Sequence, residues 1–413
     1  MRILTVTSLY PSPVQPGLAN HNRQLLKHLA RMHEVRVLAP VPWTREFKAK
    51  KHGFRIPTNR RASCDGIAVV HPRYYFPPKV ARGSYGWFYY RSIRRAFVRT
   101  VAEFQPDLVY SPWAYPDGWA AVKLSHEAEL PVVLQAMGSD VLCLPTRGRQ
   151  LSRTLAALRN ADAVSAVSGD MSRRLVEMGV LPQKVRVVYR GVDCERFQPG
   201  SRREARTRLG LPQDMPLVLF VGGLQAVKGI DVLLEACARL AARNDFNCVI
   251  VGDGPLRSHL QRRAQDLGLH HSTRFLGTVA NDQLPDWYRS ATVMVLPSHS
   301  EGVPNVLLEA AACGTPFVAS SVGGIPEIAH LGVSHLVRPA RPALLADAIE
   351  RFLAAEPPEC AATASPRSWD ASAAEIADLF EEVVRRKNRT QKPLLSRHET
   401  KVTAARDPEL LVR

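Results

Sequence analysis

The feature that most constrains this fold is the alternation of short β-branched runs with amphipathic helical segments along almost the whole chain. In the first half, the runs with the length and composition of buried strands are residues 3–9, 35–39, 108–110, 132–134, 163–167 and 185–189. Segments with apolar residues at helical spacing, such as 21–32 and 151–159, lie between them. This alternation predicts an α/β fold in which parallel sheets are covered by helices on both faces.

The same pattern restarts after a polar stretch with helix breakers at residues 198–212. The strand candidates that follow are residues 217–221, 248–251, 292–296 and 317–319. A chain of 413 residues is too long for one compact core. We therefore predict two α/β domains, an N-terminal domain over 1–190 and a C-terminal domain over 191–365.

A last amphipathic segment follows a proline-containing linker at residues 363–369. It predicts a C-terminal helix within residues 366–387, and whether this helix crosses back to the N-terminal domain is left open. Residues 388–413 are polar and aperiodic, which predicts a disordered tail.

Basic residues are concentrated in one part of the chain. The formal net charge is +17, and the many basic side chains between Arg45 and Arg99 are opposed only by Glu46 and Asp65. Such an excess suits a polyanionic partner, which can be nucleic acid, anionic lipid or a phosphorylated substrate. Nucleic acid is the least favoured because the sequence contains no recognisable reading module, such as a basic recognition helix. No nucleic-acid partner is therefore expected.

Aromatic and arginine side chains interleave at residues 85–99, inside this basic region. The pattern is typical of an amphipathic helix that lies on a membrane surface. A helix packed on the N-terminal sheet with an exposed basic face has the same periodicity. Both interpretations stay open at this point, so an anionic membrane surface is a candidate partner of the Arg45–Arg99 region.

The cysteines and histidines favour neither disulfides nor a metal site. The seven cysteines are scattered without a Cys-x-x-Cys pair, which predicts a reducing cytoplasm. The chain has no Asp-x-Asp and no His-x-x-x-His, so no metal is expected. Residues 1–10 fit a buried strand better than a signal peptide, and no uncharged apolar run reaches the ~18 residues of a membrane span. The predicted location is cytoplasmic, with peripheral attachment to the inner face of the cell membrane left open.

The strongest motif is the segment 297–310, which follows an apolar strand and enters a helix at about Pro304. Glu301 and Glu309 would be roughly 12 Å apart along one helix, too far to share a small ligand, so Glu301 is expected in the loop and Glu309 in the helix. The helix N-terminus between them suits a diphosphate, and Glu309 could accept hydrogen bonds from ribose hydroxyls. The positions that would surround the diphosphate are Gly302, Val303, Pro304 and Asn305. Two solvated glutamates are the alternative, which the strand, glycine, proline and helix context disfavours.

A second motif lies at residues 220–229, where a strand ends in Gly222 and Gly223 and Lys228 precedes a helix. Glycine lets a phosphate approach the backbone, and Lys228 would supply a positive charge. A simple turn with a solvated lysine is the alternative. The Gly-x-Gly at residues 252–254 lacks the third glycine of the dinucleotide fingerprint, so a dehydrogenase is disfavoured.

Together these motifs resemble the retaining glycosyltransferase family 4, and the resemblance extends to about Arg386. It implies the GT-B fold, in which two Rossmann-like domains have parallel sheets that face a central cleft. The C-terminal half carries the more specific part of the resemblance. Its matching elements are Glu301 and Glu309 with seven residues between them, Lys228 before Gly229, the Gly323–Glu327 segment, and Gly191-Val192-Asp193 with Phe197 and Pro199.

In the N-terminal half, the resemblance rests on Gly17 after the first strand, the Trp113–Gly118 segment and Gly138-Ser139-Asp140. It implies that Glu301 and Asp140 serve catalysis and that Gly17 faces the donor phosphate and acceptor. Three positions depart from the family pattern: Gly223 and Met137 stand where relatives carry a cation or imidazole, and Pro112 stands where histidine is common.

The resemblance implies transfer of a sugar, with retention, from a UDP- or GDP-sugar to a glycan or lipid-linked acceptor in cell-envelope or exopolysaccharide biosynthesis. The departing phosphate would help to deprotonate the acceptor hydroxyl, and neither a metal nor a separate cofactor would be needed. Two alternatives stay open: an epimerase of the same fold, and a partner protein that binds sugar nucleotide without catalysis.

Overall fold

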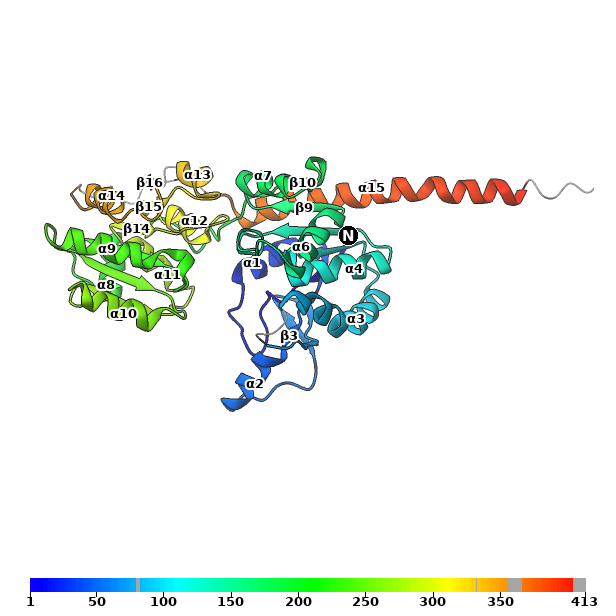
Figure 1. Ribbon diagram of the computed structural model, residues 1–413, viewed down its shortest axis with the longest axis horizontal. Coiled ribbons are helices and arrows are strands. Elements are labelled where there is room, and N and C mark those ends of the chain that lie inside the picture. Colours follow the sequence, from blue (N-terminus) through cyan, green and yellow to red (C-terminus); the bar gives the residue numbers. More distant parts are fainter. Residues whose placement is uncertain (79–81, 332, 355–365, 404–413) are drawn as a thin grey trace, which may run out of the picture.

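The computed structural model describes residues 1–78, 82–331, 333–354 and 366–403. Two lobes make up the molecule, each built on its own sheet, and a long C-terminal helix runs from between them across the first lobe and beyond it (Figure 1). Residues 363–365 of the predicted linker, and with them the predicted domain limit at residue 365, lie outside the described residues.

The first sheet has eight strands in the order β10-β9-β8-β7-β1-β2-β5-β4. Its strands are β1 (Arg2–Val6), β2 (Glu34–Leu38), β4 (Arg61–Cys64), β5 (Ile67–Val70), β7 (Leu108–Ser111), β8 (Val132–Ala136), β9 (Ala163–Ala166) and β10 (Val185–Val187), while β3 (Val41–Pro42) and β6 (Arg73–Tyr74) pair separately. All neighbours in the first sheet are parallel except β4 and β5. That hairpin corrects the expectation of purely parallel sheets; it turns at Asp65-Gly66, where both residues have positive φ.

Both faces of the first sheet are covered because neighbouring residues of a strand point to opposite sides. Leu4 of β1 joins one core cluster, with helices α3 (Tyr85–Phe104), α4 (Trp119–Glu127), α6 (Arg149–Asn160) and α7 (Gly169–Glu177). Ile3 joins the other cluster, with α1 (Asn20–Leu29) and α15 (Trp369–Thr403). Two short helices, α2 (Trp43–Lys51) and α5 (Ser139–Leu142), lie in the connections.

The second sheet has six parallel strands in the order β13-β12-β11-β14-β15-β16. Its strands are β11 (Leu217–Val221), β12 (Asn247–Val251), β13 (Thr273–Gly277), β14 (Val293–Leu296), β15 (Phe317–Ser320) and β16 (Ser334–Val337). Its helices are α8 (Arg202–Leu209), α9 (Ile230–Ala241), α10 (Arg257–Asp266), α11 (Leu284–Ser290), α12 (Asn305–Ala312), α13 (Ile325–Ile328) and α14 (Pro342–Ala354). The α/β class with two parallel-stranded sheets is confirmed.

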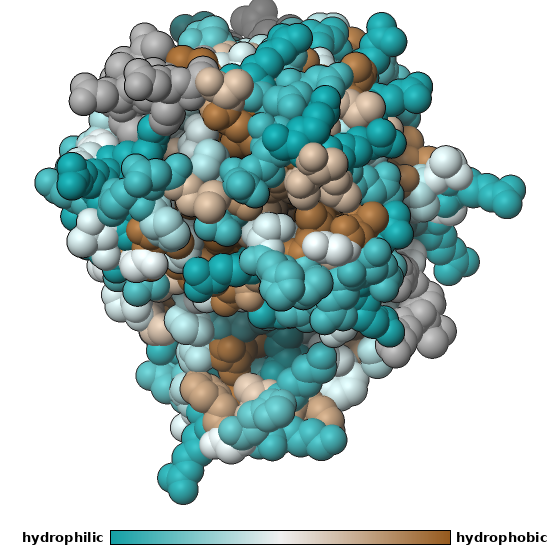
Figure 2. All heavy atoms as spheres, turned by 90° about the vertical axis from the view of Figure 1, so that its left-hand side faces the viewer, coloured by the Kyte–Doolittle hydropathy of each residue, from teal (hydrophilic) through white to brown (hydrophobic). Residues whose placement is uncertain are grey.

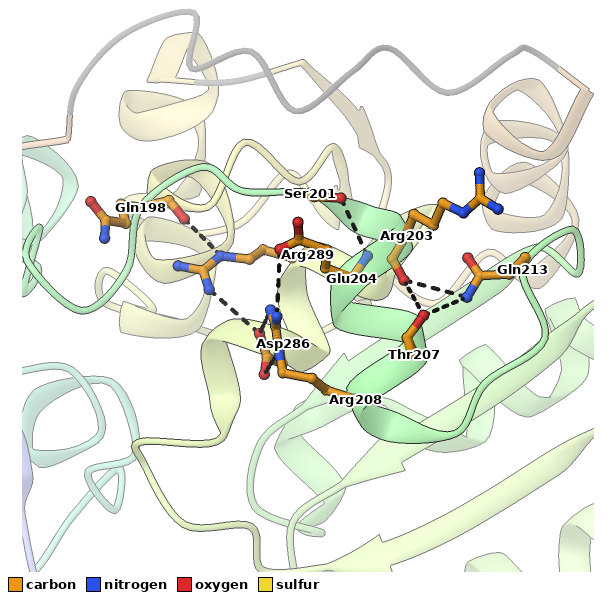
Figure 3. A network of polar contacts seen from close by, with 9 residues as sticks. All are labelled: Gln198, Ser201, Arg203, Glu204, Thr207, Arg208, Gln213, Asp286 and Arg289. Carbon is orange, nitrogen blue, oxygen red and sulfur yellow. Dashed lines mark hydrogen bonds and ion pairs between the residues drawn. The ribbon is translucent and has the colours of Figure 1, made fainter.

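The polar stretch at residues 198–212 is built into the second lobe through helix α8 (Figure 3). Asp286 of α11 receives two hydrogen bonds from Arg208 of α8 and one from Arg289, which also donates to the carbonyl of Gln198. The Ser201 hydroxyl caps the start of α8 by accepting from the amide of Glu204. Seen from the end of this lobe, the surface is mostly hydrophilic, in keeping with a core of its own (Figure 2).

Helix α15 carries the chain back onto the first lobe. Phe380 of α15 is fully buried against Tyr110 of β7, with ring centroids 5.1 Å apart. The chain passes between the lobes twice, and the two passages are hydrogen-bonded to each other. The amide of Val192, in the first passage, donates to the carbonyl of Arg367, in the second. The helix runs to Thr403, past the end near Arg386 that the sequence predicts, and the disorder expected from residue 388 onward stays a prediction. The stretch has few apolar residues, so its periodicity gave no helical signal. Residues 404–413 lie outside the described part.

Helix α3 packs on the sheet with an exposed basic side, as the second interpretation of the basic aromatic region predicts, and contact with a membrane surface stays a prediction. Tyr89, Ile93 and Phe97 are buried in the core of the first lobe. The arginines of this helix lie on its exposed side, together with Trp87. The aromatic face is therefore committed to the protein interior. Within the ranges that the structure describes, no helix combines the length and the apolar character needed to cross a bilayer.

Candidate active site

Two loops of the second lobe meet where adjacent strands end. The 222–229 loop follows β11 and the 297–304 loop follows β14, and these strands pair in parallel, so their carboxyl ends share one edge. The Nζ of Lys228 donates to Oε1 of Glu301 at 2.6 Å, and the Ser298 hydroxyl donates to the same oxygen at 2.7 Å. The two sequence motifs thus come together although they are far apart in the chain.

Backbone contacts fix these loops to each other. The amide of His299 donates to the carbonyl of Val227 at 2.8 Å. Gly229 has φ +62°, and a Cβ there would lie 2.2 Å from the carbonyl oxygen of Pro297. A larger residue at 229 would push the loops apart and carry Lys228 away from Glu301.

The N-terminus of α12 lies beside this pair. Glu301 is in the loop and Glu309 is inside the helix, as the spacing predicts. Pro304, expected at the first helical position, is instead the N-cap, because its ψ of 118° is extended, and Asn305 begins the helix. Gly302 and Val303 are buried, and their amides donate no hydrogen bond to any residue the structure describes. Free amides at a helix N-terminus form a site for an anion.

Glu309 is held by a residue that the sequence motifs did not indicate. The hydroxyl of Tyr288 in α11 donates to Oε2 of Glu309 at 2.8 Å. Burial raises the pKa of Glu309 to about 7, and the hydrogen bond from Tyr288 opposes part of that rise. The carboxyl therefore changes charge near neutral pH, and its second oxygen is available to a ligand.

The two glycines after β11 differ in how closely other atoms approach them. The Gly222 carbonyl would lie only 1.9 Å from a Cβ on Gly252, so the loops after β11 and β12 touch through backbone. Gly223 is less restricted: a Cβ there would have Gln225 Nε2 as its nearest neighbour, at 3.7 Å. Sterics do not require glycine at 223.

Asp140 does not have the geometry of a free catalytic group. Its carboxylate accepts hydrogen bonds from the amides of Ala114, Met137 and Gly138 at 2.8 to 3.1 Å. Burial raises its pKa, and these backbone donors counter the rise. Both oxygens bind backbone, so Asp140 shapes the loop after β8, and its catalytic role stays a prediction.

That loop touches the second lobe. A Cβ on Gly138, which has φ +143°, would lie 3.3 Å from the amide nitrogen of Gly302. Arg190, in the connection after β10, donates from Nη1 to Oδ1 of Asn305 at 3.0 Å and from Nη2 to the Met137 carbonyl at 3.3 Å. Gly17, by contrast, lies in the exposed loop between β1 and α1, where an added Cβ would meet no described atom within 4 Å, so it is not joined to the other site residues.

A second contact between the lobes involves Glu327, in the family-like segment 323–327. Its carboxylate accepts from the amides of Gly169 and Asp170 and from the hydroxyl of Tyr189, each at 2.8 Å. The sequence indicated the segment but not these partners, since nothing local links positions so distant. Among the described residues, no cluster of three or more His, Cys, Asp or Glu could hold a metal ion.

Comparison with known proteins identifies the family. The model for glycosyl transferases group 1 matches residues 201–374, and the model for glycosyltransferase family 4 matches residues 16–196. The putative teichuronic acid biosynthesis glycosyltransferase TuaC of Bacillus subtilis is 32% identical over 362 residues, which cover 85% of this chain and 89% of TuaC. The chain is a family 4 glycosyltransferase. A D-inositol 3-phosphate glycosyltransferase of Catenulispora acidiphila is 32% identical over 322 residues, covering 70% of this glycosyltransferase and 73% of the relative.

Solved structures confirm the GT-B fold of this glycosyltransferase. Sucrose-phosphate synthase from Thermosynechococcus elongatus matches with a TM-score of 0.71 at 22% identity, over 96% of this chain and 99% of that one. HepE from Anabaena, solved in complex with UDP-glucose, matches with a TM-score of 0.65 at 19% identity, over 95% and 99% of the two chains.

Proposed function

We propose that this glycosyltransferase moves a sugar, with retention of anomeric configuration, from a UDP- or GDP-sugar to a glycan or lipid-linked acceptor of the cell envelope or an exopolysaccharide. The names of its relatives support the acceptor class, because TuaC is named for teichuronic acid biosynthesis. The complexes of HepE with UDP and UDP-glucose support the donor class. An anionic membrane surface, reached through the exposed arginines of α3, is part of the proposal.

The observation that carries the proposal is the Lys228–Glu301 contact beside the free N-terminus of α12. The donor diphosphate would lie on the amides of Gly302 and Val303, where the helix dipole favours negative charge. Lys228 would turn from Glu301 to the phosphate, and Glu301 would then be free to accept from a hydroxyl of the donor sugar. Glu309, on the first turns of the helix, would accept from ribose.

In the reaction, the bond between the anomeric carbon and the diphosphate oxygen breaks, and the acceptor oxygen bonds to the same face of that carbon. The acceptor proton passes to the departing phosphate oxygen, so no protein base is required. Lys228 and the α12 amides stabilise the negative charge that develops on the leaving group. Under this proposal the protein uses no metal and no cofactor besides its nucleotide-sugar substrate.

Two variants test the donor site because they remove contacts to different parts of the donor. Lys228→Ala removes a charge-assisted phosphate contact of roughly 1.5 to 3 kcal/mol, so it should weaken UDP or GDP about tenfold or more and leave the nucleosides unchanged. Glu309→Gln should weaken nucleoside and diphosphate alike. Calorimetric titration with UDP, GDP, uridine and guanosine measures both, after circular dichroism has verified the fold. Unchanged diphosphate binding by Lys228→Ala contradicts the proposed phosphate site.

The two alternatives make different predictions for turnover. An epimerase converts the donor sugar without any acceptor, and a binding partner without catalysis releases no nucleotide at all. The departures at Met137 and Gly223 and the occupied carboxylate of Asp140 favour the second alternative over the first. Assays of nucleotide-sugar panels, with release of UDP or GDP and the identity of the sugar as readouts, separate all three.

A further inference from the structure

The guanidinium of Arg190 has only neutral partners. Its Nη1 donates to the Asn305 side-chain carbonyl, and its Nη2 donates to the Met137 carbonyl and lies 3.5 Å from the Met137 sulfur. Its Nε is enclosed by protein and has no hydrogen-bond partner. In the part of the chain that the structure describes, no carboxylate comes within 4.0 Å of this group.

Arg190 nevertheless remains a cation at neutral pH. Burial lowers its pKa to about 10, and the attraction of Asp140 and Glu301 opposes part of that fall. Neither carboxylate neutralises it at close range, since Asp140 accepts from three backbone amides and Glu301 from Lys228 and Ser298. A half-buried positive charge without a counterion is unfavourable, and a bound anion relieves it.

The position of this charge connects it to the candidate donor site. Asn305, which Arg190 holds, is the first residue of α12, and the amides of Gly302 and Val303 precede it. His21, which also lines the small cavity around Arg190, has its pKa lowered to about 3 by burial and by Arg190, so it is neutral and adds no competing charge.

The charges of the site can be counted without the donor. Lys228 and Glu301 form one cation and one anion in contact, so together they contribute no net charge. Gly223 contributes no side chain. Arg190 is therefore a cation beside the α12 N-terminus that is not part of the Lys228–Glu301 pair, and a positive charge in this position attracts a nucleoside diphosphate.

We propose that Arg190 is a donor-binding residue of this glycosyltransferase, which supplies a second cation to the nucleoside diphosphate from the segment that joins the two lobes. The inference rests on the proposed function and adds to it a contact from outside the second sheet. When the diphosphate binds, the guanidinium exchanges its hydrogen bonds to the neutral oxygens of Met137 and Asn305 for bonds to charged phosphate oxygens.

The test compares diphosphate and nucleoside affinity in Arg190→Gln. UDP or GDP binding should weaken about tenfold to a hundredfold while uridine or guanosine binding stays within twofold of the parent. Arg186→Gln is the matched control, because Arg186 lies on β10 of the same segment and pairs with Glu382 at 2.7 Å, away from the site. It should bind both ligands as the parent does.

Equal loss of nucleoside and diphosphate in Arg190→Gln would assign the residue a purely structural role and overturn the inference, as would unchanged diphosphate binding. Lys228→Ala, measured in parallel, keeps the two proposals apart: if it loses diphosphate affinity and Arg190→Gln does not, the donor site stands and the Arg190 contact fails. Should Arg190→Gln not fold, Arg190→Met gives the same readout, since its unbranched chain fills the space beside Met137 without a buried polar group.

Discussion

The carboxylate of Glu327 accepts a hydrogen bond from the backbone amide of Gly169, 2.8 Å away, although the two residues belong to different lobes. The same carboxylate accepts from the amide of Asp170. Both amides lie in the first turn of α7, where backbone donors have no partner within the helix. One lobe thus caps a helix of the other, close to where Gly138 and Gly302 approach.

Removing the charge of Glu327 should loosen this contact. Glu327→Gln keeps one acceptor but loses the interaction of a carboxylate with the α7 N-terminus, so we expect a cost of about 0.5–2 kcal/mol in the free energy of unfolding. Denaturant unfolding measures it. Glu177→Gln, at the exposed far end of α7, is the control and should change little. Equal stability of both variants would mean that the cap contributes nothing.

The raised pKa of Glu309 predicts a pH-dependent stability. Because its pKa is about 7 when folded and about 4.5 when unfolded, the folded state binds the proton more tightly between these values. The stabilising contribution of the protonated form is fully present below pH 4.5 and is lost as pH rises through 7. Glu309→Gln should remove this dependence, and urea unfolding at several pH values measures it. If the free energy of unfolding depended on pH in the same way in the parent and in Glu309→Gln, the raised pKa of Glu309 would be contradicted.

The same titration should appear in nucleoside binding. Above pH 7 the Glu309 carboxylate is charged and can accept from two ribose hydroxyls, so uridine or guanosine affinity should rise between pH 6 and pH 8. In Glu309→Gln the affinity should be weak and flat over that range. Calorimetry at matched ionic strength is the measurement, and a flat profile in the parent would argue against a ribose contact.

Gly223→Arg should strengthen the donor site without harming the fold. A Cβ at 223 meets nothing closer than 3.7 Å, and the added guanidinium would lie on the phosphate side of Lys228. We expect UDP or GDP to bind about tenfold more tightly, with nucleosides unchanged. Gly252→Ala is the steric contrast, since its Cβ would lie 1.9 Å from the Gly222 carbonyl oxygen, and it should be destabilised. Parent-like diphosphate binding by Gly223→Arg would place the phosphates elsewhere.

The exposed arginines of α3 give the membrane proposal its test. Arg91, Arg94 and Arg95 face away from the core, so replacing all three by Gln should leave the fold intact. Each basic residue near an anionic leaflet contributes about 1 kcal/mol, so sedimentation with vesicles rich in phosphatidylserine should fall strongly. The control replaces Arg173, Arg262 and Arg351, which are exposed on other helices. Equal sedimentation of the two triple variants would remove any special role of α3.

The sequence predicted the central strands because they are buried on both faces and form continuous apolar runs. The two edge strands of the second sheet were missed. Thr273–Gly277 and Ser334–Val337 are only partly buried, so polar residues interrupt their apolar pattern. The Asp65-Gly66 turn was present in the sequence as a hairpin signal, but the strand before it is largely exposed and polar.

For the site, the sequence located both loops because each motif is local: glycines and a lysine after one strand, and a glutamate pair across a helix start after another. It did not locate the residues that hold them. Each of these residues comes from a distant part of the chain and is placed by tertiary packing. Tyr288 donates to Glu309, Arg190 donates to Asn305, and the amide of Gly169 donates to Glu327. The sequence placed Asp140 in its loop but did not indicate that backbone amides bind both of its oxygens, because those amides come from separate loops of the fold.

The return of α15 to the first lobe determines the order in which the protein can fold during synthesis. Ile376 and Phe380 complete the cluster around Ile3 and Leu26, so the part of this sheet face that α1 does not cover stays exposed until the ribosome has made residues 369–383. Apart from Met137 and Val167, the core of the second lobe comes from the uninterrupted stretch between the two crossings, so this lobe can close earlier. The first lobe, which is synthesised first, therefore completes its folding last. Until α15 packs onto it, an apolar part of its sheet is exposed, and this is the state of the nascent chain most prone to aggregation.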